Sequence, residues 1–338
     1  MPKRDRVMEQ QYLESKKRRP RIKLEDAPPI TSIRDLIEIG HSIKFYKNID
    51  TIMLWRIKPY LEELNNLVGM DTLKESIFNQ VLYYIQGMHQ RNSSNEYLHT
   101  ILVGGPGCGK TTTAQIIGKL YQAMGILSKN GPFKIAHRDD FIAGYLGQTA
   151  LKTQKLLKSC LGGVLFIDEV YALAPRRDDK DSFSKEALDT MCSFLSEHKN
   201  EFCCIAAGYE KDINECFFAM NQGLKRRFPW VHKIEEYKSS ELADIFLKMV
   251  KDINWEVAVD SKPLATFIEK NKEYFKYAGG DVENFVTKCK IVHSRRVIGL
   301  GKEHKFVITQ ADLENGIELL KKHKDEKEET EPPYGMYT

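Results

Sequence analysis

The sequence predicts an α/β fold: a parallel five-stranded sheet with helices on both faces, followed by a small all-helical domain. Short apolar runs alternate with helical patterns, and after about residue 237 only helical patterns remain. Strands that are apolar throughout are typical of a parallel sheet that is covered on both faces. The expected strands are residues 98–103, 133–136, 163–167, 202–207 and 230–234.

A glycine-rich segment follows the first expected strand and opens a helical pattern. Backbone N–H groups of such a loop surround phosphates, a lysine meets the terminal phosphates, and a hydroxyl holds Mg²⁺. The alternative is a glycine-rich turn that binds no ligand, but the strand before it and the helix after it favour a nucleotide site with ATP and Mg²⁺ as ligands. The segment comprises Gly104, Gly105, Pro106, Gly107, Cys108, Gly109, Lys110, Thr111 and Thr112.

Two carboxylates end the third expected strand. Asp168 and Glu169 follow the apolar run 163–167. At this position Asp168 can join Thr111 near the Mg²⁺ shell, and Glu169 can polarise a water for in-line attack on the γ-phosphate. The alternative is an acidic turn without chemistry. Together with the phosphate loop upstream, the pair instead predicts nucleotide hydrolysis with Lys110, Asp168 and Glu169 in the catalytic set.

Composition bounds the setting of the protein. The chain has 338 residues and a formal net charge of +4, and no apolar run reaches the roughly 20 residues of a membrane-spanning helix. Residues 1–30 hold nine Lys or Arg and five acids, so this segment accounts for the net charge and the remainder is balanced. A basic nucleic-acid surface over the whole chain is therefore not indicated. The seven cysteines lack metal-type spacing, which favours free thiols in a reducing compartment.

Five segments are expected along the chain. Residues 1–30 predict a disordered basic arm, 31–66 an N-terminal helical extension with a break near Lys58, and 67–237 the α/β nucleotide-binding domain. Residues 238–322 predict the helical domain and 323–338 a charged flexible tail. Within the arm, Lys3-Arg4 and residues 16–19 resemble a bipartite nuclear import signal, with a solvated tail or a polyanion contact as alternatives. We expect an intracellular protein, cytoplasmic or nuclear, without membrane association.

Five stretches carry a specific resemblance. Over residues 60–300 the chain resembles AAA+ ATPases of the CbbX and SpoVK type. The resemblance implies an AAA+ core of the P-loop NTPase kind with a helical lid, and it places Val68 and Gly69 against adenine. The matching stretches are residues 104–111, 139–149, 162–173, 207–209 and 221–228.

The same resemblance implies a homo-oligomeric ring, usually of six subunits, with nucleotide at subunit boundaries. Arg227, with Arg226 in reserve, matches the arginine that reaches the neighbour's γ-phosphate. Both arginines could instead anchor helix ends. Tyr145, Leu146 and Gly147 match a pore loop that grips a polypeptide client, although Tyr145 could also be an ordinary turn residue.

Two positions depart from the commonest family pattern. The residue that senses the γ-phosphate is often Asn or Thr, whereas here Tyr209 follows Ala207-Gly208, as in CbbX-like proteins. In the helical domain Asp281 lies near the place where CbbX has an arginine, and a carboxylate cannot contact a phosphate favourably. Lys288 or Arg295 could substitute, or the helical domain could act as a lever alone.

We therefore expect an ATP-hydrolysing ring motor that remodels or threads a protein client, in the manner of a chaperone. A nucleic-acid motor or loader, bound through the basic arm, is the alternative, and it predicts salt-dependent stimulation by DNA or RNA. A third reading is an interaction protein that uses nucleotide as a switch. The carboxylate pair argues against the switch.

Overall fold

The computed structural model describes residues 24–42, 44–91, 96–145, 147–174 and 182–330. Two compact units make up the chain. The first comprises residues 1–104 and 110–234, and the second comprises residues 235–338 with the short loop 105–109. The expected nuclear import signal at Lys3-Arg4 and residues 16–19 lies outside the described residues.

The first unit is built on a parallel five-stranded sheet of order β4-β5-β6-β3-β7, which confirms the prediction. Because all strands point the same way, their carboxyl ends meet at one edge, where β3 and β6 pair up to Val103 and Gly208. This edge is where ligands bind in such sheets. The strands are β3 (Thr100–Val103), β4 (Phe133–Ala136), β5 (Val164–Ile167), β6 (Cys203–Gly208) and β7 (Trp230–Lys233).

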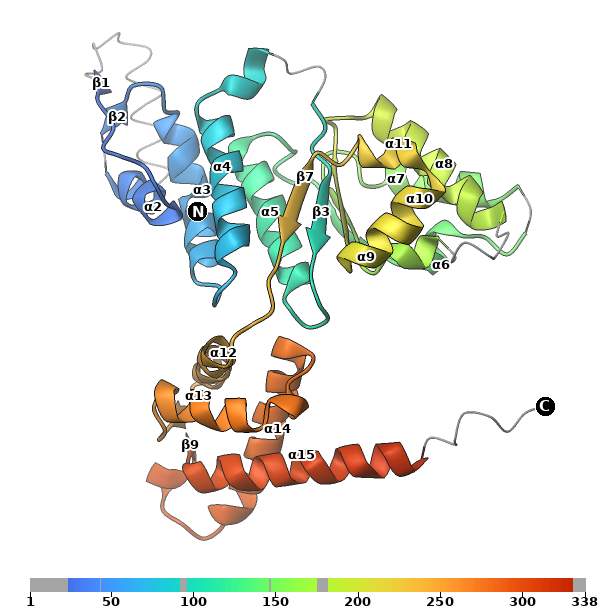
Figure 1. Ribbon diagram of the computed structural model, residues 1–338. Helices are drawn as coiled ribbons and strands as arrows, with labels where there is room; N and C mark the ends of the chain where they lie inside the picture. Colours follow the sequence, from blue (N-terminus) through green and yellow to red (C-terminus); the bar gives the residue numbers. More distant parts are fainter. Residues whose placement is uncertain (1–23, 43, 92–95, 146, 175–181, 331–338) are drawn as a thin grey trace, which may run out of the picture. The chain divides into compact units, whose positions relative to one another are not determined.

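Helices cover both faces of this sheet (Figure 1). Alternate residues of the central strands, such as Ile101 and Leu165, point into a core shared with α7 and α8. On the opposite face Gly118 of α5 lets the helix approach closely, since a Cβ there would lie 3.0 Å from Val164 Cγ2. The first face carries α6 (Arg138–Phe141), α7 (Thr149–Lys158), η2 (Val170–Leu173), α8 (Ser182–Glu197), α9 (Glu210–Asp212), η3 (Ile213–Phe217), α10 (Phe218–Met220) and α11 (Gln222–Lys225); the other carries α4 (Asp71–Ile85), η1 (Met88–Arg91) and α5 (Lys110–Met124).

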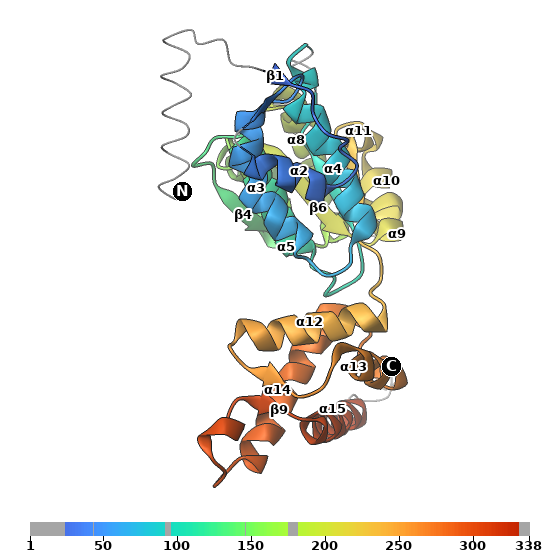
Figure 2. The ribbon, with the colours of Figure 1, turned by 90° about the vertical axis from the view of Figure 1, so that its left-hand side faces the viewer.

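The N-terminal segment packs outside α4 and α5, on the side away from the sheet (Figures 1 and 2). It contains α2 (Ile33–His41) and α3 (Thr51–Asn65), together with β1 (Leu24–Glu25), which pairs in parallel with β2 (Phe45–Tyr46). The end of the expected arm is thus ordered, because Lys44 and Lys47 bond the carboxylates of Glu25 and Asp26 at 2.8 and 2.9 Å.

The break expected near Lys58 is wrong, since α3 runs without interruption through Pro59. A proline inside a helix removes one hydrogen bond and costs about 3 kcal/mol. The apolar stripe of α3 offsets this cost. Its members are fully buried: Leu54, Ile57, Leu61 and Leu64.

The second unit is mainly helical and encloses its own apolar core, which includes Phe246, Phe285 and Ile308. Figures 1 and 2 show its helices in orange and red. They are α12 (Ser239–Asp252), α13 (Ser261–Lys270), η4 (Lys272–Tyr274), α14 (Ala278–Arg296), η5 (Lys302–His304) and α15 (Gln310–Thr330).

Two details of this unit differ from the expected all-helical domain and flexible tail. A short parallel pair, β8 (Glu256–Val257) with β9 (Val307–Ile308), joins distant segments. Two-residue strands carry no periodicity that a sequence pattern could reveal. In addition, α15 continues to Thr330, so the segment expected as a tail from residue 323 is helical up to that point. Across the described residues, no helix is long and apolar enough to cross a membrane.

Candidate functional site

The phosphate loop connects β3 to α5 at the carboxyl edge of the sheet. Gly107 and Gly109 have φ values of +66° and +91°, a backbone conformation that L side chains rarely adopt. At the start of the loop the Gly104 N–H donates to the Gly208 carbonyl at 3.1 Å, which fixes the loop to the end of β6. The Lys110 ammonium donates to the Gly104 carbonyl at 3.3 Å.

The two predicted carboxylates end β5, and β6 is the strand between β5 and β3. Asp168 is half-buried and Glu169 exposed. Glu169 has φ 48° and ψ 48°, a left-handed backbone conformation, and its N–H donates to Asp168 Oδ1 at 3.0 Å. The sheet therefore brings the phosphate loop and the carboxylate pair to the same edge, as the sequence predicted.

Tyr209 follows β6 and lies between these two elements. Its ring centroid is 5.9 Å from Lys110 Nζ and 6.0 Å from the ring centroid of Tyr171. Tyr171 in turn lies close to the side chain of Glu169, two residues earlier in the chain. Burial and the nearby Glu169 carboxylate raise the pKa of Tyr171 to about 12. Sequence reasoning gave Tyr171 no role, and its position two residues after Glu169 is the signal that could have drawn attention to it.

The donor set suits a nucleotide with Mg²⁺. Thr111 is half-buried at the start of α5, and Asp168 lies at the end of β5. In the described part of the chain no group of three or more His, Cys, Asp or Glu residues could hold a metal alone. Mg²⁺ in nucleotide sites is bound by one or two protein ligands, waters and substrate phosphates. The hydroxyl of Thr111 and the carboxylate of Asp168 fit that requirement.

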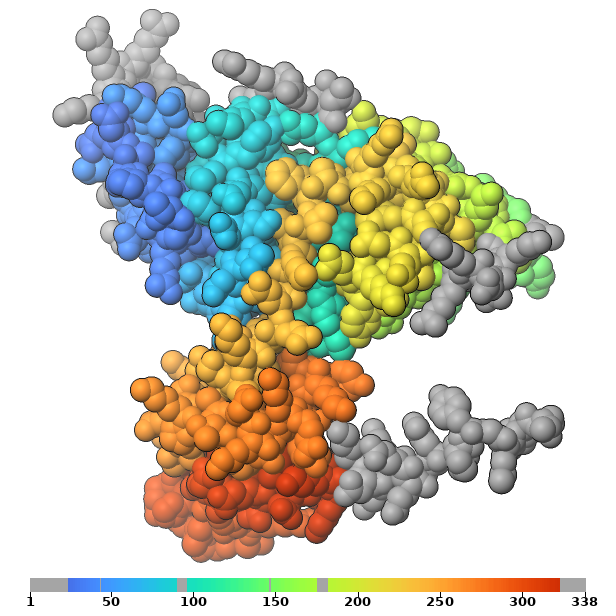
Figure 3. Space-filling model, in the orientation of Figure 1, coloured from blue at the N-terminus to red at the C-terminus, as the bar shows by residue number. Residues whose placement is uncertain are grey.

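The two candidate arginines have different surroundings. Arg227 is half-buried, and its Nε and Nη1 donate to Ser196 Oγ at 2.9 Å and to the Gly223 carbonyl at 2.6 Å. Arg226 is exposed at the end of α11. Figure 3 shows the surrounding segment, in yellow, at the surface of the first unit. Arg227 thus makes the helix-anchoring contacts that the sequence left open as an alternative, and Arg226 faces solvent.

The candidate pore loop lies between α6 and α7. The Tyr145 side chain is 75% exposed, which is unusual for an aromatic residue and argues against a core role. Gly147 has φ +78°, a turn conformation that favours glycine. Leu146 lies outside the described residues.

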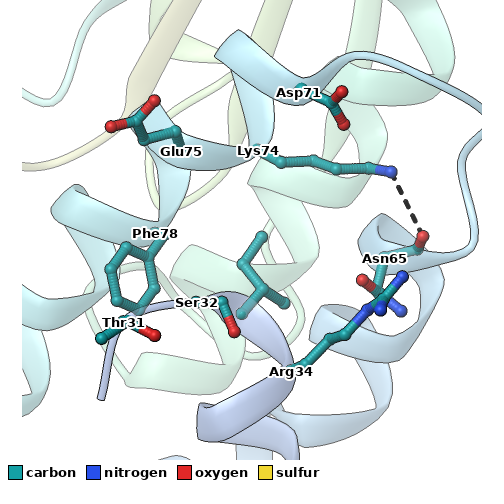
Figure 4. Close-up of a pocket in the computed structure, with 9 residues that line it drawn as sticks. Thr31, Ser32, Arg34, Asn65, Asp71, Lys74, Glu75 and Phe78 are labelled. Atoms are coloured by element: carbon teal, nitrogen blue, oxygen red, sulfur yellow. Dashed lines mark hydrogen bonds between the residues drawn. The ribbon is translucent and has the colours of Figure 1, made fainter. Parts of the chain in front are cut away.

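Val68 and Gly69, the predicted adenine contacts, lie half-buried between α3 and α4. The Lys74 ammonium fixes this segment by donating to the carbonyls of Leu67 at 2.7 Å and Asn65 at 3.3 Å. Figure 4 shows Lys74 extending towards Asn65. A pocket of about 390 Å³ beside Lys74 is lined by residues of α2, α3 and α4. These contacts join the segment that contains Val68 and Gly69 to α3 and α4.

In the second unit Asp281 accepts a hydrogen bond from the Tyr277 N–H at 2.6 Å at the start of α14. This contact explains the carboxylate near the place where CbbX has an arginine: Asp281 stabilises the first turn of the helix. Lys288 and Arg295 lie further along α14.

Fold and site together define a P-loop nucleotide-binding protein. The family model "ATPase family associated with various cellular activities (AAA)" matches residues 100–222. A putative cfxQ-like protein of Acanthamoeba polyphaga mimivirus is 36% identical over 85% of this chain and 71% of its own length. Stage V sporulation protein K of Bacillus subtilis is 33% identical over 72% of this chain and 77% of its own length. The chain belongs to the AAA ATPase family, in its CfxQ- and SpoVK-like group, and it is an ATPase.

A chloroplastic ribulose bisphosphate carboxylase/oxygenase activase from Cyanidioschyzon merolae is 32% identical over 69% of this chain and 77% of its own length. Among solved structures, the AAA domain of FIGL-1 in complex with ADP aligns with a TM-score of 0.54 at 14% identity and covers 80% of this chain and 90% of its own. A RuvB mutant of Thermotoga maritima aligns at 0.52 and 16% identity, covering 76% and 72%. These two structures support the fold alone.

Proposed function

We propose that this ATPase assembles as a ring, most simply a hexamer, and uses hydrolysis to remodel or thread a polypeptide client. The observation that carries the proposal is the 75% exposed Tyr145, on a loop of the unit that holds Lys110, Asp168 and Glu169. An exposed ring on a glycine-containing loop suits transient contact with an extended chain, because aromatic side chains bury large areas against varied partners. The relative named as an activase supports a remodelling role for the group.

In this proposal the residues at the sheet edge divide the chemistry. The Gly104–Gly109 backbone and Lys110 bind the phosphates, while Val68 and Gly69 contact adenine. Thr111 and Asp168 would hold Mg²⁺, which would supply positive charge beside the phosphates. Glu169 orients the attacking water and accepts its proton, and Tyr209 senses the γ-phosphate through its place beside Lys110.

In the proposed oligomer, each subunit supplies an arginine to the nucleotide site of its neighbour. Motif position favours Arg227, whereas exposure favours Arg226, because Arg227 is bonded to Ser196 and Gly223 within its own subunit. Arg226→Ala and Arg227→Ala separate the two. The trans-acting arginine is the one whose loss reduces turnover by about 10³-fold or more while subunit stability and ATP binding stay unchanged. Loss of stability in Arg227→Ala together with full turnover would assign that residue to anchoring.

Glu169→Gln tests the hydrolysis step. The variant keeps the shape of the side chain but removes its ability to accept a proton, so we expect ATP binding to persist and turnover to fall by about 10²-fold or more. Unchanged turnover would overturn the assignment. The same variant, held in its ATP-bound form, retains clients for identification by pull-down.

Tyr145→Ala tests client handling. Basal hydrolysis should stay near the wild-type rate, and stimulation by a trapped client should disappear. Client processing that survives this change would refute threading through Tyr145. Salt-dependent stimulation by DNA or RNA in place of protein would favour the nucleic-acid motor, which otherwise depends on arm residues outside the described part of the chain.

A further inference from the structure

Tyr171 lies beside both the candidate base, Glu169, and Tyr209, the aromatic residue next to Lys110. Its hydroxyl lies near the Glu169 carboxylate, and its ring lies 6.0 Å from that of Tyr209. Tyr209 in turn lies against the Lys110 ammonium. A continuous series of contacts thus joins the carboxylate after β5 to the lysine after β3.

The backbone of β6 fixes the Tyr171 ring. A Cβ atom added at Gly208 would lie 3.0 Å from Cδ1 and 3.2 Å from Cε1 of Tyr171, so the ring packs directly against the last residue of the strand. Gly208 also accepts the hydrogen bond from Gly104 at the start of the phosphate loop. The ring therefore rests on the same backbone that positions the loop.

The helical turn that carries Tyr171 is also held firmly. Val170 and Leu173 are buried in the core of the first unit. Arg138 Nη1 donates to the Ala172 carbonyl at 2.6 Å, and the Ala174 N–H donates to the Tyr171 carbonyl at 3.0 Å. The Tyr171 hydroxyl is consequently a fixed point beside an otherwise exposed carboxylate.

We propose that Tyr171 is a positioning residue for hydrolysis: its hydroxyl donates a hydrogen bond to the Glu169 carboxylate and holds it where the attacking water is activated. An exposed glutamate samples several rotamers, and one fixed donor reduces that freedom. The inference rests on the proposed role of Glu169 as the base. Because the pKa of Tyr171 is raised to about 12, the hydroxyl keeps its proton and remains a donor through the neutral range.

The chain offers a matched control. Tyr83 in α4 also donates to a carboxylate, that of Glu96, and this bond raises the pKa of Tyr83 to about 12. No nucleotide role is assigned to Tyr83. The pair of variants Tyr171→Phe and Tyr83→Phe therefore removes a tyrosine hydroxyl beside a carboxylate at two places, and each keeps the ring.

Steady-state ATPase kinetics on the full chain test the proposal, with thermal unfolding measured alongside. We expect Tyr171→Phe to lower kcat by about 10-fold with KM for ATP within about twofold, because the lost contact orients the base and not the substrate. Tyr83→Phe should leave both constants unchanged. An unchanged kcat in Tyr171→Phe, or a higher KM at full kcat, would refute the positioning role.

A double variant separates this inference from the function on which it rests. If Tyr171 acts through Glu169, then Tyr171→Phe added to Glu169→Gln should lower kcat by less than about twofold more. A full further 10-fold loss would show that Tyr171 acts independently, and the proposal would fail. If Glu169→Gln alone retained wild-type turnover, the role of the base would fail first. If Glu169→Gln lowers kcat as expected but Tyr171→Phe does not, the positioning role of Tyr171 fails and the role of Glu169 as the base remains.

Discussion

Carboxylates in the two units have opposite surroundings. Asp312 in the second unit has a side chain that is 1% exposed and fully paired. Asp168 and Glu169 at the sheet edge of the first unit are half-buried and exposed, respectively. The Asp312 oxygens accept hydrogen bonds of 2.8–3.1 Å from Arg296 Nε and Nη2, Thr309 N and Oγ1, and His293 Nδ1.

The contrast indicates what each carboxylate does. A carboxylate whose lone pairs are all occupied contributes to stability but has no free acceptor for a substrate, a metal ion or a water. The pair at the sheet edge keeps access to solvent, which its proposed chemistry requires. The stabilising carboxylate and the reactive carboxylates therefore lie in different units, and variants at the two places should have opposite effects.

Asp312→Asn should give the largest change in stability. Removing the charge leaves Arg296 without its ionic partner, which costs about 3 kcal/mol for a buried pair. Chemical denaturation of the full chain, followed by hydrogen exchange in peptides of α14 and α15, would measure it. Glu169→Gln should change the free energy of unfolding by less than about 0.5 kcal/mol.

Asp252→Asn, a change at an exposed carboxylate of the same unit, is the control and should be neutral. Equal stabilities of the Asp312 and Asp252 variants would remove the contrast between the two carboxylate environments.

Acid should affect the units in different pH ranges. Burial lowers the pKa of His232 from 6.5 to about 4 and that of His99 to about 3, so between these values and 6.5 the unfolded chain binds protons that the folded first unit does not. Stability of the first unit should therefore fall as the pH drops below 6.5. The contacts of Asp312 with Arg296, Thr309 and His293 outweigh burial and hold its pKa at about 2, so that contribution persists above 3.8 and is lost between 3.8 and 2.

Hydrogen exchange, corrected for the intrinsic effect of pH, should thus show protection falling in β3 and β7 at pH 5 while α14 and α15 keep theirs. His232→Gln should reduce the loss of protection in the first unit at pH 5, so that the two units differ less in hydrogen exchange. Simultaneous loss in both units at pH 5 would contradict the assignment of the two ranges.

The smallest expected effect concerns Lys74. Lys74→Met removes two hydrogen bonds to the backbone of the segment next to Val68 and Gly69, each worth about 1 kcal/mol. Part of this lost free energy should weaken ATP binding, so that KM for ATP rises about threefold while kcat stays the same. Lys47→Met removes a surface ion pair with Asp26 and serves as the control. A change in kcat without a change in KM would show that this segment does not contribute to nucleotide binding.

The sequence predicted the five strands and the place of the loop well because apolar runs, glycines and paired carboxylates are local signals. Contacts made across the fold were not predictable in this way. The packing of Tyr171 against Gly208 depends on the neighbouring strand. The hydrogen bond from Arg227 to Ser196 joins residues 31 positions apart in the sequence. Pro59 misled the prediction because helix α3 gains its stability from buried partners that no local pattern reveals.

The packing of α3 on α5 has a practical consequence. Lys119, in the helix that begins at the phosphate loop, bonds both carboxylate oxygens of Glu63 at 2.8 and 3.0 Å, and Leu61 and Leu64 are fully buried. A shortened form that starts at residue 67, where the expected nucleotide-binding domain begins, would expose the apolar flank of the nucleotide-binding helix. Such a fragment would be expected to aggregate, and weak turnover measured on it would reflect lost support for α5 and not the catalytic power of the intact protein.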